Sequence, residues 1–525
     1  MPARRVLAGA LACCAFLPAT GAAGASLGTP SRPAPLTIPA MQRWHPATGV
    51  WRFAATTAVE VRRRHGAAAR EARVLAADLG RQAGRAVAVV VASEPTAGDI
   101  VMRTVARSRR LGSEGYRLDV GRALTIEAST GAGLFYGGRS LLQMLRQGST
   151  LPCGTAVDWP RYPQRGLMVD ASRTTYSTAW VLREIRRLAA LKLNVLHLHL
   201  TDDQRWALGS RVFPSVVGKR PFTRADIRRI VDLARRDHVT VIPEIEMPGH
   251  MAAFLVHHKR LILKPAGVAS PSTVGAYTTD KLDITSPAAL RAVRRILDEY
   301  LAWFPGRYFD IGSDEYLSPA EYPLFPQLET YATRRYGVGA TPADAVHGFI
   351  NWVDRIVRAH GKTLRIWSDQ VGGVGKVAVN RDVILEWWDS ISPFGDTLTV
   401  SPQTLLDRGY RIVNAGWYPN YYTTDIGPVR GKASLPGVYA GWQVNDFDGT
   451  QVGSSVTSKQ QVAAASPGLL GAQMNIWGPL DETPAQTARR VEPHLAVLAQ
   501  KAWDSPSPAA SYAEFARDLT RVGLP

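Results

Sequence analysis

Apolar and polar residues alternate with two different periods along the larger, second part of the chain. Short apolar runs are typical of buried strands, and between them apolar residues recur every three to four positions, as in amphipathic helices. The segments 179–191 and 224–236 are examples of the second kind. Strands that alternate with helices, eight times over, predict an α/β fold of the (β/α)8 barrel type rather than an open sheet. The eight predicted strands are 166–171, 194–200, 239–244, 308–312, 363–367, 383–387, 411–415 and 471–477.

The part before the barrel has a mixed pattern that predicts a small α/β domain. We expect a helix over 67–83 and a Gly-rich turn that leads into a helix over 131–145. A buried strand at 86–92 and two further strands at 116–120 and 124–128 complete the pattern. Three prolines between 152 and 163 mark a boundary, and no catalytic groups cluster before it. The expected organisation is a small non-catalytic α/β domain (41–158), a catalytic barrel (159–505) whose connection 416–470 is irregular, and a C-terminal tail or helix (506–525).

The first 40 residues have the layout of the N-terminus of an exported protein. Two arginines close to Met1, an apolar stretch over 6–18 and small residues up to Ala25 are the three parts of a secretory signal. We therefore expect a signal peptide at 1–25, a linker rich in Pro, Ser and Thr at 26–40, and a secreted protein. A lipid anchor on the early cysteines is the weaker alternative. Only Cys153 lies beyond the signal, so we expect no internal disulfide.

The net charge of +18 raises the question of a nucleic-acid partner. The excess of 62 Lys+Arg over 44 Asp+Glu is mostly arginine, spread along helical patterns, and no basic run interleaves with aromatic residues. We interpret this charge as solvated helix faces and expect no nucleic-acid partner. Beyond the signal, no stretch is long and apolar enough to predict a membrane span.

Polar residues gather at the carboxyl ends of the predicted strands, and the fourth strand is the sharpest case. It leads from Phe309 to two adjacent carboxylates, Asp314 and Glu315. Successive side chains of a strand face opposite ways, so these two converge only if the strand has ended and the backbone turns. The C-terminal mouth of a barrel is where such groups catalyse reactions. Two close carboxylates also push their pKa values apart. The alternative is a strand-end Asp that caps the next helix, with Glu in its first turn.

Aromatic residues at other strand ends favour a sugar as the ligand. Any single tryptophan is more often core, but four lie at strand ends: Trp367, Trp387, Trp388 and Trp477. Indole packs on the apolar face of a pyranose, while charged and amide groups bind its hydroxyls.

The histidines leave two interpretations open. His197 and His199 share one side of their strand and fit either a metal hydrolase or the barrel interior. Because no cysteine and no second His pair completes a site, we expect no metal. His250, after a Pro-Gly turn, is either an ordinary loop histidine or a group that holds and tunes a neighbouring carboxylate.

Four segments together resemble glycoside hydrolase family 20, the β-N-acetylhexosaminidases. They are 165–173 (RGLMVDASR), 193–204 (LNVLHLHLTDDQ), 242–250 (IPEIEMPGH) and 311–315 (IGSDE), in the family's order. The small domain resembles the family's N-terminal domain through 115–118 and 133–143, so the resemblance covers about residues 40 to 500.

The resemblance implies a retaining enzyme without cofactor or metal. The 2-acetamido oxygen of the substrate would attack the anomeric carbon, an exception to the usual two-carboxylate mechanism. Glu315 would be the general acid and then base, and Asp314 would hold the acetamido N–H and stabilise the oxazolinium intermediate. The expected partner is an N-acetylhexosamine-containing oligosaccharide or glycoconjugate. The other implied site residues are Arg165 (sugar hydroxyls), Asp202 and His250 (support of Glu315), Trp367, Trp387 or Trp388, and Trp477 (pocket walls), and Tyr421 or Tyr422 (acetamido oxygen).

The chain departs from the family pattern at several positions. The family often has His in place of Asp310 and Gly in place of Ser313, and Pro479 stands where a sugar-binding acid is common. Ser313 with Tyr316 is closer to branches that act on disaccharide or otherwise substituted ends. An exo-acting β-N-acetylhexosaminidase is therefore the first prediction, with a lacto-N-biosidase-like enzyme or a catalytically weak glycan-binding relative as alternatives.

Overall fold

The computed structural model describes residues 34–266, 279–372, 375–388, 400–423, 434–448, 451–452, 455–456, 459–478 and 481–525. The predicted signal and the first part of the predicted linker lie outside these residues.

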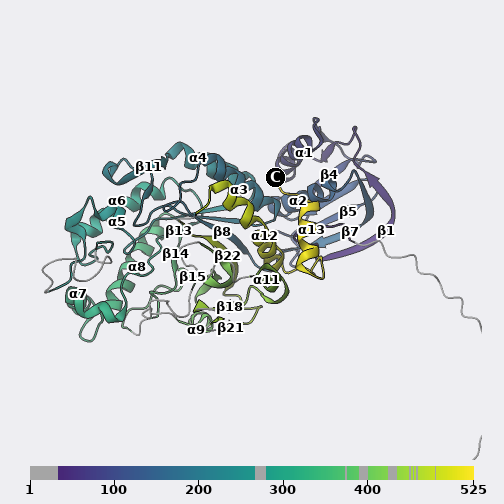
Figure 1. The fold of residues 1–525 in the computed structure, drawn as a ribbon. Helices are drawn as coiled ribbons and strands as arrows, with labels where there is room; N and C mark the ends of the chain where they lie inside the picture. The colour runs from purple at the N-terminus through teal and green to yellow at the C-terminus, as the bar shows by residue number, and fades with distance from the viewer. Residues whose placement is uncertain are drawn as a thin grey trace, which may run out of the picture. The chain divides into compact units, whose positions relative to one another are not determined.

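Eight parallel strands form a closed barrel, as the sequence predicts (Figure 1). Each strand pairs with the next in the chain, and the last one pairs with both the seventh and the first, which closes the ring. The strands are β8 (Gln164–Asp170), β9 (Val195–His199), β12 (Thr240–Glu244), β13 (Tyr308–Asp310), β14 (Thr363–Trp367), β15 (Ile384–Trp387), β16 (Arg411–Asn414) and β22 (Leu469–Ile476).

Amphipathic helices connect most of the barrel strands. Helix α4 shows how the sequence sets their limits: Thr223 forms a capping box with Asp226, and the apolar residues of α4 face the barrel. The helices are α3 (Thr178–Ala190), α4 (Arg224–Arg236), α5 (Ala252–Leu255), α6 (Pro287–Leu301), α7 (Pro326–Tyr336), α8 (Pro342–Ala359), α9 (Pro402–Asp407), α10 (Trp417–Asn420), α11 (Leu435–Gly441), α12 (Pro484–Trp503) and α13 (Tyr512–Val522).

Short elements decorate the ends of the barrel. Strand β17 (Tyr421–Tyr422) pairs with β22. The small two-stranded pairs are β10 (Trp206–Leu208) with β11 (Val217–Phe222), β18 (Asp446–Asp448) with β21 (Lys459–Gln461), and β19 (Gln451–Val452) with β20 (Ser455–Val456). Within the described residues, 3-10 turns span Pro214–Val216, Lys259–Leu261 and Pro319–Leu324.

The preceding domain is a seven-stranded sheet in the order β1-β7-β5-β6-β4-β2-β3. Its strands are β1 (Arg43–Arg52), β2 (Val59–Val61), β3 (Val89–Val91), β4 (Ile100–Thr104), β5 (Tyr116–Val120), β6 (Leu124–Ala128) and β7 (Thr150–Asp158). Helices α1 (Ala67–Ala83) and α2 (Gly131–Arg146) pack against each other and against the sheet.

Two local predictions for this region are wrong. The segment predicted as a buried strand at 86–92 forms only the short β3, which is an exposed edge strand with Val91 50% exposed. Residues 34–40 do not behave as a linker, because Ile38 is fully buried and its N–H donates to Gln143 Oε1 at 2.8 Å. In neither segment does the spacing of apolar residues indicate whether the segment is exposed or buried.

A search of the described helices finds none with the length and apolarity needed to cross a membrane.

Candidate active site

The backbone turns sharply after β13 and brings the two adjacent carboxylates together. Gly312, Ser313 and Glu315 have φ angles of 60°, 65° and 46°, in the left-handed region that residues with a side chain seldom adopt. As a result, Glu315 Oε2 lies 3.3 Å and Asp314 Oδ2 3.6 Å from the same atom, His250 Nε2. The predicted convergence of the two acids is confirmed. Strain of this kind persists where the surrounding structure holds it, and it is common at functional sites.

The two acids differ in their affinity for a proton. Burial, together with the negative charges of Asp369 and Glu315, raises the pKa of Asp314 to about 8, although His250 acts in the opposite direction. Burial also acts on Glu315, but its hydrogen bond to His250 and the His250 charge outweigh burial and lower the pKa of Glu315. In the free site, therefore, Asp314 holds the proton and Glu315 is ionised near neutral pH.

His250 is held on its other side by the acids that follow β9. Its Nδ1 lies 3.3 Å from Asp203 Oδ2 and 3.7 Å from Asp202 Oδ1. Burial opposes a charge on His250, but Asp202 and Asp314 raise its pKa well above the usual range. The chain of contacts places Asp202 and Asp203 behind His250, which in turn contacts both catalytic candidates.

Arg173 lies in the site, although the sequence pattern did not lead us to predict a role for it. Its guanidinium pairs with Asp202 at 2.7 Å and with Asp170 at 3.2 Å, and it lies over the ring of Trp477 at 5.3 Å. The Arg173 charge also contributes to the lowered pKa of Glu315. Arg173 follows the C-terminal end of β8, at the barrel mouth. Its place in the sequence, just after a predicted barrel strand, could have identified it as a site residue.

The prediction that Arg165 binds sugar hydroxyls is wrong. Arg165 lies at the start of β8, at the opposite end of the barrel, and its side chain is fully buried. Its guanidinium pairs with Glu114 of the small domain at 2.9 Å and donates to the Tyr162 and Lys192 carbonyls. Arg165 therefore connects the barrel to the small domain and does not reach the mouth.

Five aromatic side chains form one cluster at the mouth. Ring centroids are 5.8 Å apart for Trp367–Trp477, 5.9 Å for Tyr421–Trp477 and 6.0 Å for Tyr421–Trp417. Trp388 joins through Trp417, and its Nε1–H donates to Asp369 Oδ1 at 3.1 Å. Asp369 Oδ2 in turn accepts the Glu315 N–H at 2.8 Å. The aromatic cluster and the carboxylate pair thus share a hydrogen-bonded partner.

The aromatic cluster shows which member of each adjacent pair, Trp387 or Trp388 and Tyr421 or Tyr422, faces the site. Trp387 packs on Phe447 in the main core and donates to the Val400 carbonyl, so it faces away from the mouth. Tyr422 likewise faces away, and its hydroxyl donates to Glu482 at 2.9 Å. Trp388 and Tyr421 face the site. Trp417 belongs to the cluster but lies in the irregular connection, where no periodic pattern indicated it.

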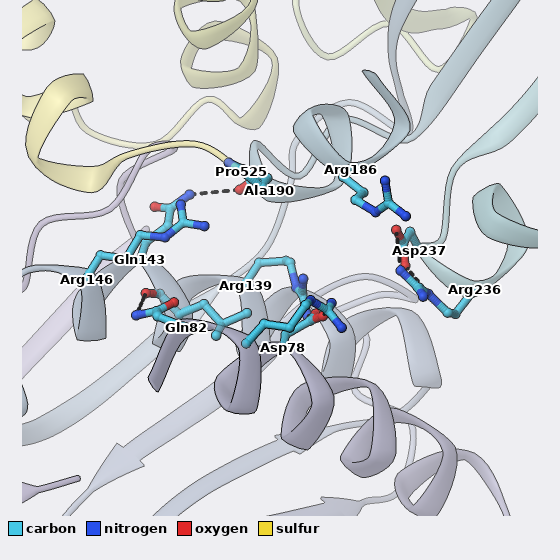
Figure 2. Close-up of a pocket in the computed structure, with 12 residues that line it drawn as sticks. Asp78, Gln82, Arg139, Gln143, Arg146, Arg186, Ala190, Arg236, Asp237 and Pro525 are labelled. Carbon is cyan, nitrogen blue, oxygen red and sulfur yellow. Dashed lines mark hydrogen bonds and ion pairs between the residues drawn. The ribbon is translucent and has the colours of Figure 1, made fainter. Parts of the chain in front are cut away.

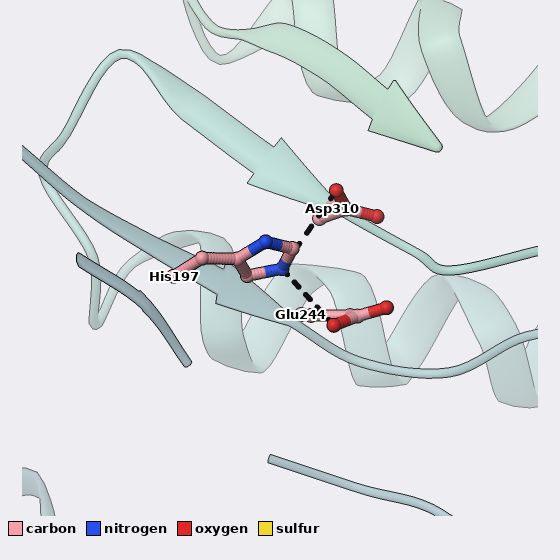
Figure 3. A group of neighbouring side chains, drawn as sticks. All are labelled: His197, Glu244 and Asp310. Carbon is pink, nitrogen blue, oxygen red and sulfur yellow. Dashed lines mark ion pairs between the residues drawn. The ribbon is translucent and has the colours of Figure 1, made fainter. Parts of the chain in front are cut away.

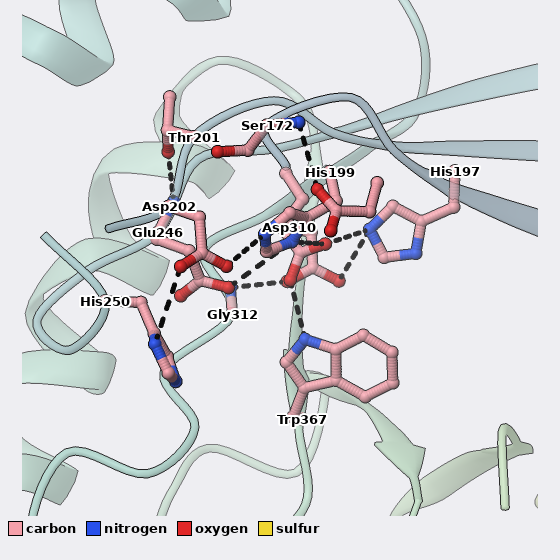
Figure 4. Close-up of polar contacts among 12 residues, drawn as sticks. Ser172, His197, His199, Thr201, Asp202, Glu246, His250, Asp310, Gly312 and Trp367 are labelled. Carbon is pink, nitrogen blue, oxygen red and sulfur yellow. Dashed lines mark hydrogen bonds and ion pairs between the residues drawn. The ribbon is translucent and has the colours of Figure 1, made fainter. Parts of the chain in front are cut away.

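The barrel interior below the site is a network of buried charges (Figures 3 and 4). His197 Nε2 lies 3.0 Å from Glu244 Oε2 and 3.8 Å from Asp310 Oδ2, and His199 lies 2.8 Å from both Glu244 and Asp202. Burial opposes a charge on His199, but its acidic neighbours raise its pKa to about 10. The atoms of His197, Glu244 and Asp310 are close enough to hold a metal ion, yet charged histidines already balance Glu244, which favours an ion-pair network.

The structure places Tyr316 and Glu482, an acid shortly after Pro479, while Pro479 itself lies outside the described residues. Tyr316 is fully buried and donates to the Leu282 carbonyl at 2.6 Å, so it is a core residue. Glu482 has only 2% of its side chain exposed and pairs with Arg490 at 2.8 Å. In this arrangement Glu482 is engaged with Arg490 and Tyr422, which face away from the aromatic cluster.

A barrel mouth with an acid pair, an arginine and an aromatic cluster has the features expected of a barrel that binds carbohydrate. Comparison with known proteins identifies the family. The family model "Glycosyl hydrolase family 20, catalytic domain" matches residues 162–506, and "Glycosyl hydrolase family 20, domain 2" matches residues 34–159. The chain therefore belongs to glycoside hydrolase family 20.

The relatives include enzymes of two named specificities. A lacto-N-biosidase from Bifidobacterium bifidum is 31% identical over 502 residues, covering 94% of this chain and 42% of the relative. A beta-N-acetylhexosaminidase from Cellulomonas fimi is 27% identical over 458 residues, covering 82% and 83%. The solved GH20 beta-N-acetylhexosaminidase from Streptomyces coelicolor A3(2) superposes with a TM-score of 0.70 at 26% identity, covering 94% and 97%. The chain spans about half the length of the first curated relatives, 42% and 58%.

Proposed function

We propose that this protein is a retaining exo-β-N-acetylhexosaminidase that uses the acetamido group of its own substrate. The observation that carries the proposal is the convergence of Asp314 and Glu315 on His250. Two carboxylates that are neighbours in the chain leave little room for the separate acid and nucleophile of an ordinary retaining glycosidase. Substrate-assisted catalysis needs only one group that carries the proton and one anion, and Glu315 and Asp314 can supply these.

In the proposed first step, the acetamido oxygen attacks C1 of the sugar. The C1–aglycone bond breaks, and Glu315 donates its proton to the departing oxygen. Asp314 accepts a hydrogen bond from the acetamido N–H and stabilises the positive charge of the oxazolinium ring. In the second step, Glu315 takes a proton from water while that water attacks C1, and the bond between C1 and the acetamido oxygen breaks. Two inversions at C1 leave the product with the original configuration. Arg173 and the aromatic cluster hold the sugar, and Tyr421 donates to the acetamido oxygen.

This scheme requires the shared proton to change places when substrate binds. In the free site the proton is on Asp314, whose pKa is about 8. An N–H donated by the substrate stabilises the anionic form of Asp314, and an aglycone that excludes water from Glu315 raises the pKa of Glu315. Both effects move the proton from Asp314 to Glu315, where the first step needs it.

The test is Glu315→Gln, assayed with an aryl N-acetyl-β-glucosaminide. General acid–base catalysis typically contributes about 10²- to 10⁴-fold, so kcat should fall by that factor while substrate binding persists. Glu329→Gln, an exposed change on α7, is the matched control. A thiazoline mimic of the cyclised intermediate should bind the wild type tightly. Unchanged turnover in Glu315→Gln, or an active enzyme insensitive to the thiazoline, would contradict the proposal.

A second candidate is a lacto-N-biosidase-like enzyme that releases a disaccharide. Two observations favour it: the similarity to the Bifidobacterium bifidum lacto-N-biosidase, and a cavity of about 1060 Å³ beside the site. Asp203 lines this cavity and also contacts His250, and Gln204, Arg205 and Lys219 add polar groups. Such a volume is in the range that holds a ligand larger than one sugar ring.

A direct comparison of substrates separates the two candidates. Aryl glycosides of β-GlcNAc, β-GalNAc and β-lacto-N-biose should be assayed side by side. Faster release of a single N-acetylhexosamine supports the first proposal, and exclusive release of the disaccharide supports the second.

We also propose that the protein is exported, on the strength of the predicted signal at 1–25. Expression of the full chain in its native type of cell should give an extracellular form whose N-terminus begins near residue 26. Retention of the uncleaved chain inside the cell would contradict this.

A further inference from the structure

An arginine-rich cavity of about 290 Å³ lies where the small domain meets the barrel (Figure 2). Helices α1 and α2 of the small domain and the C-terminal ends of α3 and α4 contribute to it. Barrel helices run antiparallel to the strands, so these ends lie at the N-terminal side of the barrel, away from Asp314 and Glu315. We call this the arginine cavity. Pro525 also lines it, and its charged side chains are Asp78, Arg81, Arg139, Arg146, Arg186, Arg236 and Asp237.

The lining has five arginines against two aspartates, and the acids are already engaged. Asp78 accepts from both Arg81 and Arg139. Asp237 accepts from Arg236 at 2.7 Å. Three of the five guanidinium groups therefore share two carboxylates, which neutralise two of the five positive charges.

The other two arginines carry the excess of charge. Arg146 donates to the Gly523 carbonyl, and Arg186 makes a long contact of 3.4 Å to the Leu182 carbonyl. Among the residues that the structure describes, neither one forms an ion pair with a carboxylate. Burial and the nearby charge of Arg139 lower the pKa of Arg146. The cavity therefore has a positive potential that a bound anion would relieve.

We propose that the arginine cavity binds a tetrahedral oxyanion, either sulfate or phosphate, free or as the ester group of an anionic sugar. Guanidinium forks match such oxygens with paired, charge-assisted hydrogen bonds. The cavity volume fits a group of this size and excludes a long polyanion from its interior. The site is separate from the catalytic centre, so the proposal does not depend on the function proposed above.

The experiment is calorimetric titration of the full chain with sodium sulfate and with sodium phosphate, against sodium chloride at the same ionic strength. We expect saturable 1:1 binding of sulfate or phosphate and none of chloride. Arg146→Gln/Arg186→Gln should weaken binding by about 100-fold or more, since each of the two lost charge-assisted contacts contributes about tenfold. The catalytic rate should stay as in the wild type.

The matched control is Arg183→Gln/Arg229→Gln, which removes two charges from exposed positions on α3 and α4 outside the cavity. It should bind the anion like the wild type. Arg146→Lys/Arg186→Lys keeps the charge, loses the fork and should give an intermediate affinity, which keeps the test valid if the Gln variant folds poorly. N-acetylglucosamine 6-sulfate and 6-phosphate, compared with the inorganic ions, assign the source: a tighter ester indicates a glycan, and a tighter free ion indicates the solvent pool. Absence of saturable binding to the wild type, or equal binding by the Arg146→Gln/Arg186→Gln variant, overturns the proposal.

Discussion

Arg165 and Arg173 lie at opposite ends of one strand and have different tasks. Arg165, at the start of β8, pairs with Glu114, while Arg173, beyond its end, pairs with Asp202 and lies over Trp477. Their residue type is the same, and the position relative to the strand decides which of them faces a ligand.

Replacing each arginine should therefore have a different effect. Arg173→Lys should lower kcat/KM by about 10- to 100-fold, because Lys cannot reproduce a planar fork toward hydroxyls and carboxylates. Arg165→Lys should leave KM nearly unchanged and lower thermal stability instead. Steady-state kinetics and thermal unfolding of both variants check this. A larger KM effect from Arg165→Lys than from Arg173→Lys would contradict the assignment.

The acid pair predicts a pH dependence for the free enzyme. In the proposed mechanism the pair shares one proton that catalysis requires. The raised pKa of Asp314, about 8, means that this proton is present below pH 8 and lost above it. We expect kcat/KM to fall about tenfold per pH unit on the alkaline side of pH 8. Asp314→Asn should remove this alkaline limb along with most of the activity toward acetamido substrates. A wild-type limb that starts near pH 6 would contradict the charge assignment.

At the scale of single elements, the two-residue period of strands decides which aromatic side chains face the site. Glu386 faces the barrel interior, where it accepts from Arg365 at 2.8 Å. Trp388 is two positions further along and faces the same way, while Trp387 faces the outer core. Strand β17 repeats the pattern, with Tyr421 inward and Tyr422 outward.

Tyr421→Phe and Tyr422→Phe form a matched pair to test this. In the proposed mechanism the Tyr421 hydroxyl bonds the acetamido oxygen in the transition state. Its loss in Tyr421→Phe should therefore lower kcat by roughly 10- to 100-fold. Tyr422→Phe removes only the bond to Glu482 and should leave kcat within about twofold. Single-turnover rates of the two variants provide the measurement, and equal losses of rate would contradict the assignment of Tyr421 rather than Tyr422 to the site.

At the scale of the whole molecule, buried ion pairs join the small domain to the barrel. Lys192 Nζ lies 2.8 Å from Asp158 Oδ2, and both side chains are fully buried. Asp158 also accepts from Tyr116 and Trp503. These contacts, with Arg165–Glu114, connect segments that are far apart in the sequence.

Asp158→Asn should destabilise this junction without changing the chemistry. The change leaves the Lys192 charge buried and unpaired, which costs about 3–5 kcal/mol of unfolding free energy. Denaturant unfolding should show that loss, while kcat at low temperature stays near the wild-type value. An exposed change such as Asp232→Asn on α4 is the control. If the unfolding free energy does not fall, the pair does not stabilise the junction.

The sequence by itself determined the order of strands and helices, the barrel and the identity of the acid pair. Periodicity and short contiguous motifs record these features, because they depend on neighbours in the chain. Asp314 and Glu315 were identifiable for that reason, and so was the family.

Only the tertiary structure decided which arginine faces the mouth, that Trp417 joins the aromatic cluster, and which carboxyl group holds the proton in the free site. Apolar residues have no regular spacing in the irregular connection that contains Trp417, so the sequence did not predict its position. The proton depends on His250, Asp369 and Glu315, brought together from loops after three different strands. The arginine cavity likewise combines helices of two domains. The physical reason is common to all of these: burial and charge act through space, and the chain order does not record those distances.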